Sequence, residues 1–253
     1  MRIHGVRRMT VAATAFGTLL GALSACGSEA AGPARAGGAT GSRGQAGPRP
    51  TVSTVPTTDP TRIPGVGDRL SRQIPRDSDQ VVAVYGEGGD SADSTVVLYT
   101  REGPAWRPVA DWPGHNGRNG WTMDHHMGDE RSPVGVFGLS GAGGVLDAPG
   151  TRLPYDQDEG AYAPPNDWGE AHQHDFDYVI AIDYNRLPGT APDDPTRPEG
   201  DDKGGGIWLH LDHGDGTSGC VSVSKDAMEF LLRTLDPDRH PVMVMGDRAE
   251  LSA

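Results

Sequence analysis

Hydrophobic and polar residues alternate in short runs through most of the chain after residue 77. Two of these runs, 81–85 and 95–100, are rich in β-branched residues, and a loop that contains Gly88-Gly89-Asp90 separates them. β-Branched side chains favour extended backbone, whereas glycine and aspartate favour turns. The pattern therefore predicts a β-hairpin. Further runs predict strands at 134–139, 178–182, 207–211 and 242–245.

One segment near the C-terminus has the spacing of an amphipathic helix instead. Its large apolar residues fall at i, i+3, i+4 and i+7, Ser224 precedes them, and Asp236-Pro237 follows. A serine hydroxyl can accept the free N–H groups of a first helical turn, and proline does not continue a helix. We expect this helix to pack one apolar stripe in the core. The stripe consists of Met228, Leu231, Leu232 and Leu235.

The composition agrees with a mainly β protein that has few helices. The chain has 253 residues, of which 35% are hydrophobic, and it includes 37 glycines and 21 prolines. This length allows one domain of ordinary size with extensions. Because abundant glycine and proline favour loops and strands over helical bundles, we expect one β domain at 78–253.

The N-terminal region has the pattern of an export signal. Three arginines precede a short apolar run at 11–22, and Leu23-Ser24-Ala25-Cys26-Gly27 follows. This pattern resembles a bacterial lipoprotein signal, which implies cleavage before Cys26 and lipidation of that cysteine. We expect residues 1–25 to be a signal peptide and the exported protein to be lipid-anchored to the outer face of the cytoplasmic membrane, facing the cell wall. An ordinary signal peptide with a chance cysteine is the alternative.

A tether is the interpretation of residues 26–77. Up to about Pro64 this segment is mostly Gly, Ala, Pro, Ser and Thr, without an aromatic residue or a leucine. Such a composition does not bury a core. We therefore predict a disordered spacer between the lipid anchor and the folded domain.

The charge of the chain excludes one class of partner. The formal net charge is −13, and removal of residues 1–25, with three arginines and no acidic residue, changes it to −16. A surface with this charge repels nucleic acid and anionic lipid head groups. We expect no nucleic-acid partner.

Candidate chemistry comes from the two cysteines. If Cys26 is lipidated, Cys220 is the lone thiol of an exported domain, and no intramolecular disulfide explains it. His210 ends the run Ile207-Trp208-Leu209-His210 and projects from the face opposite the apolar residues. A histidine beside a thiol can take its proton, and an imidazolium lowers the thiol pKa. We predict Cys220 as nucleophile and His210 as base; a buried structural cysteine with a surface histidine is the alternative.

Gly219 is the predicted oxyanion residue. Glycine gives the backbone room to bend, so that the N–H groups of Gly219 and Cys220 can converge on a developing oxyanion.

These residues resemble a known family. Ile207–His210 and Thr217-Ser218-Gly219-Cys220-Val221 resemble the catalytic signature of the L,D-transpeptidases of the bacterial cell wall, also called the YkuD or ErfK/YbiS family. The resemblance covers roughly residues 78–246 and implies a β-sandwich catalytic domain. Other segments that fit the family are Ser132-Pro133-Val134-Gly135-Val136-Phe137, Gly117-Arg118-Asn119-Gly120 and 178–185.

The chain departs from the family motif at two positions. Ser218 stands where a histidine is usual, and Ser222 stands where the family has arginine or asparagine. By its place in the motif, Ser218 is counted among the candidate catalytic residues. The resemblance places the base at His210, with His213 in a Gly/Asp turn as the competitor. In this family the group that orients the base is often a backbone carbonyl; Asp212 is the candidate among side chains.

A lid over the site is a further implication of the resemblance. The segment 141–170, with Tyr155, Tyr162 and Trp168, resembles the family's lid in position, and a plain long loop is the alternative. Tyr162, Trp168 and Trp208 are our candidate substrate-binding residues.

The resemblance also implies a reaction. Cys220 would attack the carbonyl before the fourth-position D-alanine of a peptidoglycan stem peptide and form a thioester. A side-chain amine of a second stem would then give a 3-3 cross-link, whereas water would give L,D-carboxypeptidase activity. No cofactor or metal is implied, and we expect a monomer whose partners are the stem peptides and, through its lipid, the membrane.

Two other functions remain open from the sequence. A zinc cell-wall peptidase is motivated by His172-Gln173-His174-Asp175 and by His125-His126 beside Asp124, although no H-E-x-x-H motif is present. A lipoprotein that binds peptidoglycan without turnover is motivated by Ser218 in place of the usual histidine.

Overall fold

The computed structural model describes residues 59–253. The predicted signal peptide, Cys26 and most of the predicted tether lie outside the described residues. Within residues 59–253, no helix combines the length and the apolar character needed to cross a membrane.

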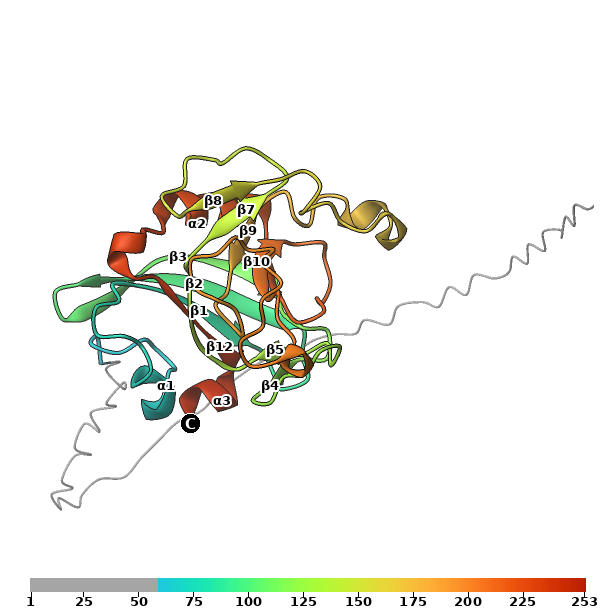
Figure 1. Cartoon of the computed structure of the whole chain (residues 1–253). Helices are drawn as coiled ribbons and strands as arrows, with labels where there is room; N and C mark the ends of the chain where they lie inside the picture. The colour runs from blue at the N-terminus through green and yellow to red at the C-terminus, as the bar shows by residue number, and fades with distance from the viewer. Residues whose placement is uncertain (1–58) are drawn as a thin grey trace, which may run out of the picture. The chain divides into compact units, whose positions relative to one another are not determined.

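The described chain is mostly β, as the sequence predicted. Ten strands form one mixed sheet in the order β6-β12-β1-β2-β3-β11-β10-β9-β7-β8, and β4 pairs with β5 apart from it (Figure 1). The strands are β1 (Gln80–Gly86), β2 (Asp93–Glu102), β3 (Ala105–His115), β4 (Trp121–Thr122), β5 (Ser132–Pro133), β6 (Gly135–Gly138), β7 (Ala142–Gly144), β8 (Tyr155–Gln157), β9 (Val179–Ala181), β10 (Trp208–Leu211), β11 (Val221–Val223) and β12 (Val242–Asp247).

The predicted strands are present, and β1 and β2 form the predicted antiparallel hairpin. The sequence pattern did not predict β3, because Pro108 and Pro113 interrupt it. Proline cannot donate to a strand ladder and is tolerated where one strand edge is free. β3 pairs with β2 along its length but with β11 only through Gly114 and His115, so most of its second edge has no neighbouring strand in the sheet.

The predicted helix is α2 (Lys225–Thr234). Ser224 Oγ accepts a hydrogen bond from the Ala227 N–H at 3.3 Å, and all four residues of the apolar stripe are 0% exposed. The helix ends before Asp236-Pro237, as predicted. The remaining helices are α1 (Asp68–Ser71), α3 (Arg248–Ser252) and the 3-10 turns η1 (Asn166–Trp168), η2 (Glu170–His172), η3 (Asp201–Lys203) and η4 (Pro237–Arg239).

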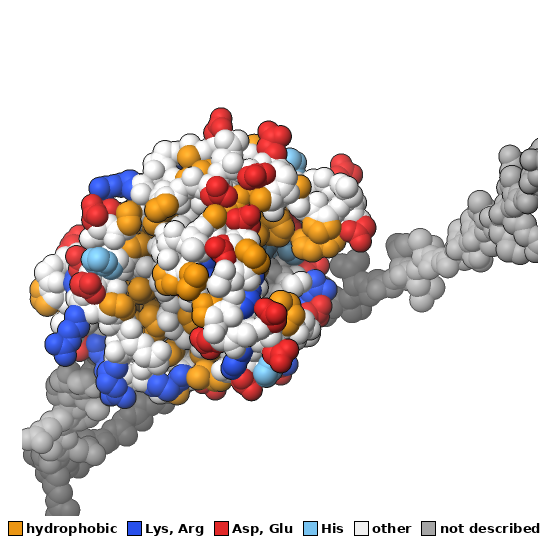
Figure 2. Space-filling view, viewed as in Figure 1, with side chains coloured by type: hydrophobic (Ala, Val, Ile, Leu, Met, Phe, Trp, Pro, Cys, Tyr) orange, Lys and Arg blue, Asp and Glu red, His pale blue; other side chains and the backbone are white. Residues whose placement is uncertain are grey.

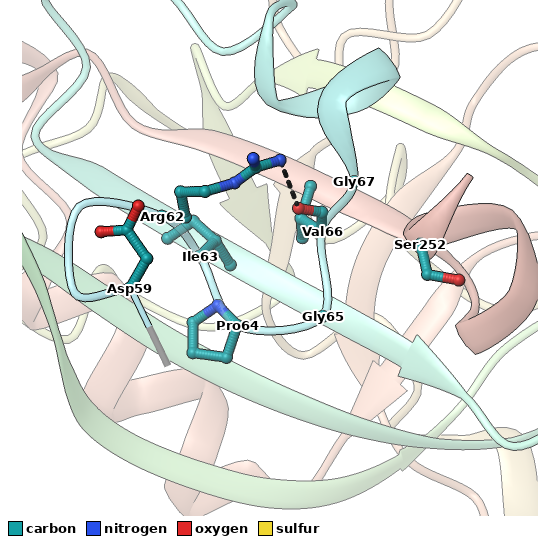
Figure 3. A pocket seen from close by; sticks show the side chains of 8 residues that line it. All are labelled: Asp59, Arg62, Ile63, Pro64, Gly65, Val66, Gly67 and Ser252. Atoms are coloured by element: carbon teal, nitrogen blue, oxygen red, sulfur yellow. Dashed lines mark hydrogen bonds between the residues drawn. The ribbon is translucent and has the colours of Figure 1, made fainter. Parts of the chain in front are cut away.

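The folded domain begins earlier than the predicted start at residue 78, because the segment 59–77 packs against it. Ile63, Val66 and Leu70 are only 2%, 4% and 1% exposed, and they belong to the hydrophobic core. The segment curls beside α3, so that Ser252 lines one pocket together with Asp59 and residues 62–67 (Figure 3). Three apolar side chains spaced over eight positions were enough to bury this segment, although its composition resembles a spacer. The folded unit therefore includes residues 59–77.

The surface of the folded unit agrees with the acidic composition. Acidic side chains are spread over the face shown in Figure 2, among hydrophobic and neutral groups. Lys and Arg side chains also lie on this face, several of them near its lower left edge.

Candidate active site

Strands β10 and β11 bring His210 and Cys220 to one face of the sheet. The two strands are parallel neighbours, with Leu209 opposite Val221 and His210 opposite Ser222. Side chains alternate along a strand, so His210, Ser222 and Cys220 share the face opposite Leu209 and Val221, which are fully buried. Both His210 and Cys220 line a cavity of about 400 Å³. The predicted pair therefore meets at one cavity.

A backbone carbonyl orients the His210 ring. His210 is 3% exposed, and its Nδ1 lies 2.8 Å from the Leu211 carbonyl oxygen. Because a carbonyl oxygen only accepts, Nδ1 carries the proton and Nε2 keeps the lone pair in the neutral ring. Nε2 can therefore act as the base. This is the type of orienting group that the family resemblance implied.

Asp212, the side-chain candidate for orienting His210, has other partners. Its Oδ1 accepts a hydrogen bond from Ser222 Oγ at 2.7 Å and lies 2.6 Å from His115 Nδ1. Asp212 therefore ties the end of β10 to β11 and β3.

The resting thiol and imidazole are both neutral. Burial raises the pKa of Cys220 to about 11 and lowers the pKa of His210 to about 4. The Asp175 carboxylate raises both pKa values, so it counteracts the effect of burial on His210 and adds to the effect of burial on Cys220. The sequence predicted a thiol pKa lowered by an imidazolium, and this prediction is wrong for the ligand-free site because desolvation dominates.

Two backbone groups hold the thiol, one at the start of β10 and one just before it. The Trp208 N–H lies 3.4 Å from Cys220 Sγ, and Sγ lies 3.6 Å from the Gly206 carbonyl oxygen. These contacts fix the sulfur at the start of β11, at the wall of the cavity.

The Gly219 N–H differs from our expectation of an oxyanion donor. Gly219 has φ of +137°, a region that favours glycine, but its N–H donates to Thr217 Oγ1 at 3.1 Å. Thr217 Oγ1 in turn donates to the Cys220 carbonyl at 2.7 Å. The Gly219 donor is therefore occupied in this conformation. No role was assigned to Thr217 from the sequence. Threonine hydroxyls often accept the N–H two residues further along the chain in a turn, and this rule could have indicated its bond to Gly219.

Ser132 holds the same loop from the other side. Its side chain is fully buried; Oγ donates to the Gly219 carbonyl at 2.8 Å and accepts the Gly117 N–H at 2.9 Å. A Cβ on Gly117 would lie 2.6 Å from the Glu130 carbonyl oxygen, so this close approach needs glycine. The two upstream segments that resemble the family thus support the Cys220 loop.

Only Trp168 of the three predicted substrate-binding aromatic residues lines the cavity, where it is 46% exposed. Tyr162 is 1% exposed; its OH donates to Asp156 Oδ2 at 3.1 Å, and its ring packs against Trp208. Trp208 Nε1 donates to the Pro192 carbonyl at 3.1 Å. Tyr162 and Trp208 therefore support the fold beside the site, in contrast to our assignment.

The segment 141–170 contains regular structure. Its strands β7 and β8 extend the large sheet beyond β9, and only its end reaches the cavity, through Trp168. Ser218 also lines the cavity and is exposed. Charged groups at the cavity include Arg118 and Glu130, whose Nη1 and Oε1 lie 3.6 Å apart.

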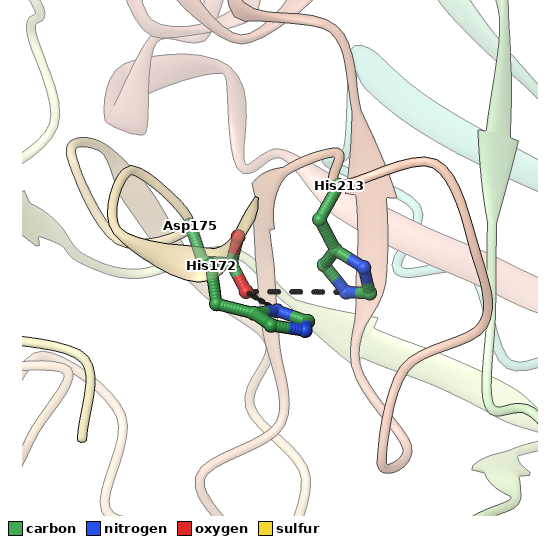
Figure 4. A group of neighbouring side chains, drawn as sticks. All are labelled: His172, Asp175 and His213. Atoms are coloured by element: carbon green, nitrogen blue, oxygen red, sulfur yellow. Dashed lines mark hydrogen bonds and ion pairs between the residues drawn. The ribbon is translucent and has the colours of Figure 1, made fainter. Parts of the chain in front are cut away.

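His213, the competing candidate for the base, lies at the cavity as well, and its side chain is only 6% exposed although it belongs to a Gly/Asp turn. Its ring is parallel to that of His210, with 6.0 Å between centroids. Asp175 Oδ2 lies 2.8 Å from His172 Nδ1 and 3.9 Å from His213 Nε2 (Figure 4). His172, Asp175 and His213 form one cluster beside the Cys220–His210 pair, which the sequence did not predict.

The histidine pairs proposed for a zinc peptidase do not converge. His174 Nδ1 lies 3.2 Å from Asp177 Oδ2, whereas His172 groups with Asp175 and His213. His125 Nδ1 lies 3.0 Å from Asp129, whereas His126 Nε2 lies 3.3 Å from Asp124. These neighbouring histidine pairs therefore do not form the zinc site that the sequence suggested.

Comparison with known families decides the relationship of the chain. The profile of the YkuD family, described as the L,D-transpeptidase catalytic domain, matches residues 90–244. The chain belongs to the L,D-transpeptidase (YkuD) family. The matched residues include His210, Cys220 and the supporting segments around Gly117 and Ser132. The cavity of this L,D-transpeptidase-family domain and the segments that support it therefore lie within the part of the chain that matches the family.

No curated protein matches this L,D-transpeptidase-family protein significantly. Two solved structures are similar: Bd1075 of Bdellovibrio bacteriovorus, at 18% identity and TM-score 0.37, and the helical cell shape determining protein Pgp2 from Campylobacter jejuni, at 19% identity and TM-score 0.40. The matches cover 67% and 68% of this chain. They cover 48% and 49% of the other two chains, so the similarity extends over about half of each.

Proposed function

We propose that this L,D-transpeptidase-family protein acts on peptidoglycan stem peptides through a Cys220 thioester and forms 3-3 cross-links. One observation carries the proposal: the Cys220 thiol and a His210 ring with an available Nε2 line the same cavity. A nucleophile, a base and a third group that orients the base are the parts that acyl transfer to a thiol requires.

The first half-reaction transfers an acyl group to sulfur. Cys220 Sγ attacks the carbonyl carbon of the bond to D-alanine while its proton moves to His210 Nε2. The neutral resting pair means that this proton moves during attack, as general-base catalysis, rather than before substrate binds. The C–N bond then breaks, His210 returns the proton to the leaving amine, and D-alanine departs.

The second half-reaction returns the thiol. An amine of a second stem attacks the thioester carbonyl, His210 Nε2 takes the amine proton, and that proton passes to the departing sulfur. We assign the Cys220 N–H as an oxyanion donor, since the Gly219 N–H is bonded to Thr217. The bonds of Ser132 and Thr217 to this loop would keep that donor in place.

Mass spectrometry of a disaccharide-tetrapeptide incubated with the purified chain tests the proposal. We expect a dimer that has lost one D-alanine, and no product with Cys220→Ala. A tripeptide product without dimer would mean that the protein is an L,D-carboxypeptidase and not a transpeptidase. Unchanged substrate that nevertheless binds the chain would favour the peptidoglycan-binding function and reject the enzyme.

The choice of base has its own comparison. His210→Ala should abolish the acyl-enzyme on Cys220, whereas His213→Ala should leave it detectable. If only His213→Ala abolishes the acyl-enzyme, the assignment of His210 is wrong.

We also propose that the protein is exported and lipid-anchored through Cys26. The pattern that precedes Cys26 supports this location. A Cys26→Ala variant should be released from the membrane fraction, and unchanged retention would reject lipidation.

A further inference from the structure

The side chains of His172, Asp175 and His213 form or break no bond in the proposed acyl transfer. They come from two separate segments, η2 with the turn that follows it and the turn after β10. One ligand atom from each residue lies within 4.8 Å of the others, and all three residues line the same cavity as Cys220 and His210. Among residues 59–253 this is the one convergent group of three such side chains.

The distances in the cluster suit a small divalent ion. Zinc bonds of about 2.1 Å at tetrahedral angles place neighbouring ligand atoms about 3.4 Å apart. Asp175 Oδ2 lies 2.8 Å from the nitrogen of His172 and 3.9 Å from that of His213, on either side of this value. Shifts of about half an ångström would therefore bring each of these two distances to the spacing that one ion requires.

The surroundings hold the cluster in place. Asp175 is 3% exposed, and its backbone carbonyl accepts a hydrogen bond from the Leu211 N–H at 2.9 Å. This bond holds the turn against β10. The rings of His172 and His213 are 4.4 Å apart between centroids, and Figure 4 shows both turned toward the Asp175 carboxylate. A site that is already assembled loses little conformational entropy when it binds an ion.

We propose that His172, Asp175 and His213 bind one Zn²⁺ ion, with its fourth position open to the cavity that Cys220 and His210 line. Two imidazoles and one carboxylate with an open position are a ligand set typical of zinc. The fourth ligand would be water or a carboxylate oxygen of a molecule in the cavity. Binding needs neither the Cys220 thiol nor turnover, so the proposal stands apart from the acyl-transfer function.

Calorimetric titration of the chelator-treated chain with Zn²⁺ tests this site. We expect one ion per chain for the unmodified protein, with a thermal unfolding temperature that rises with zinc concentration. His172→Gln, Asp175→Asn and His213→Gln should each weaken binding by about 100-fold or more, since loss of a group that merely supports a ligand already costs about 10–100-fold.

Two variants serve as matched controls. His174→Gln removes a neighbouring histidine whose partner is Asp177, and Cys220→Ala removes the thiol; both should bind zinc as tightly as the unmodified chain. If Cys220→Ala abolishes binding, the thiol is the ligand and the proposal is wrong. Equal losses in His174→Gln and His172→Gln, or no stoichiometric binding at all, would also overturn it.

Cobalt substitution gives a second readout that does not depend on the stability of one variant. Co²⁺ bound by these three residues and one further ligand should give the intense visible absorption of a four-coordinate site. His172→Gln changes a partly exposed residue, so its fold can be checked by circular dichroism even if Asp175→Asn unfolds. A folded His172→Gln chain that keeps the same cobalt spectrum would reject His172 as a ligand.

Discussion

Burial of neutral His210 should make the fold sensitive to mild acid. The perturbation is a change from pH 7.5 to pH 5.0 in the metal-free protein. In the unfolded chain the imidazole has its ordinary pKa of about 6.5, whereas in the fold burial lowers the pKa of His210 to about 4. Between these values the unfolded state binds more protons, so the free energy of unfolding falls as the pH falls below 6.5.

The magnitude follows from these two values. At pH 7.5 the ring is neutral in both states and the effect is close to zero. At pH 5.0 nearly all unfolded rings carry a proton but few folded rings do, which lowers the free energy of unfolding by about 2 kcal/mol. The charges that face the ring are those of Asp175, Asp212 and His213, and burial outweighs the two carboxylates that favour protonation.

Urea denaturation at the two pH values is the assay, with His210→Asn as the control. Other titrating groups act in both proteins, so the difference between their pH effects isolates His210. The unmodified chain should lose about 2 kcal/mol more than the variant between pH 7.5 and pH 5.0. Equal losses in the two proteins would refute the idea that His210 is buried in its neutral form.

Three further predictions concern the thiol, the loop support and a buried ion pair. The rate of Cys220 alkylation by iodoacetamide should rise about tenfold per pH unit from pH 6 to pH 9, since the pKa near 11 leaves little thiolate; a rate independent of pH over this range would indicate a preformed ion pair. Ser132→Ala should lower the free energy of unfolding by about 1–3 kcal/mol, because it removes the partner of two buried backbone groups, and urea curves that match the unmodified chain would contradict this support. Asp183→Asn should lower the free energy of unfolding by about 3–5 kcal/mol, because Arg186 is buried and loses its carboxylate partner. Glu229→Gln, which breaks a more exposed local ion pair with Arg233, should lower it by less than about 1 kcal/mol in the same denaturation assay.

Local patterns predicted much of the fold. Alternation of side chains along 81–85 and 95–100 is a property of the extended backbone itself, so the β1–β2 hairpin could be predicted without knowing its neighbours. The same holds for α2, whose cap at Ser224 and apolar stripe lie within one short segment. Pro108 and Pro113 concealed β3, because their tolerance depends on an edge that only the complete sheet defines.

The candidate site divides in the same way. Cys220 and His210 could be singled out because both lie in one short stretch with a family signature, and their strand positions place them on one face. Burial of Tyr162 and the hydrogen bond of Trp208 to Pro192 depend on how distant segments pack, so exposure of these aromatic rings could not be read from their spacing.

The sequence by itself determined the mainly β class, the position of α2 and the cysteine–histidine pair, since each depends on residues near one another along the chain. Only the tertiary structure decided the parallel pairing of β10 with β11, the support of the Cys220 loop by Ser132, and the meeting of His172, Asp175 and His213. The last two of these features join segments far apart in sequence. The pKa directions of Cys220 and His210 likewise follow from desolvation, which depends on everything that surrounds a group and not on its neighbours along the chain.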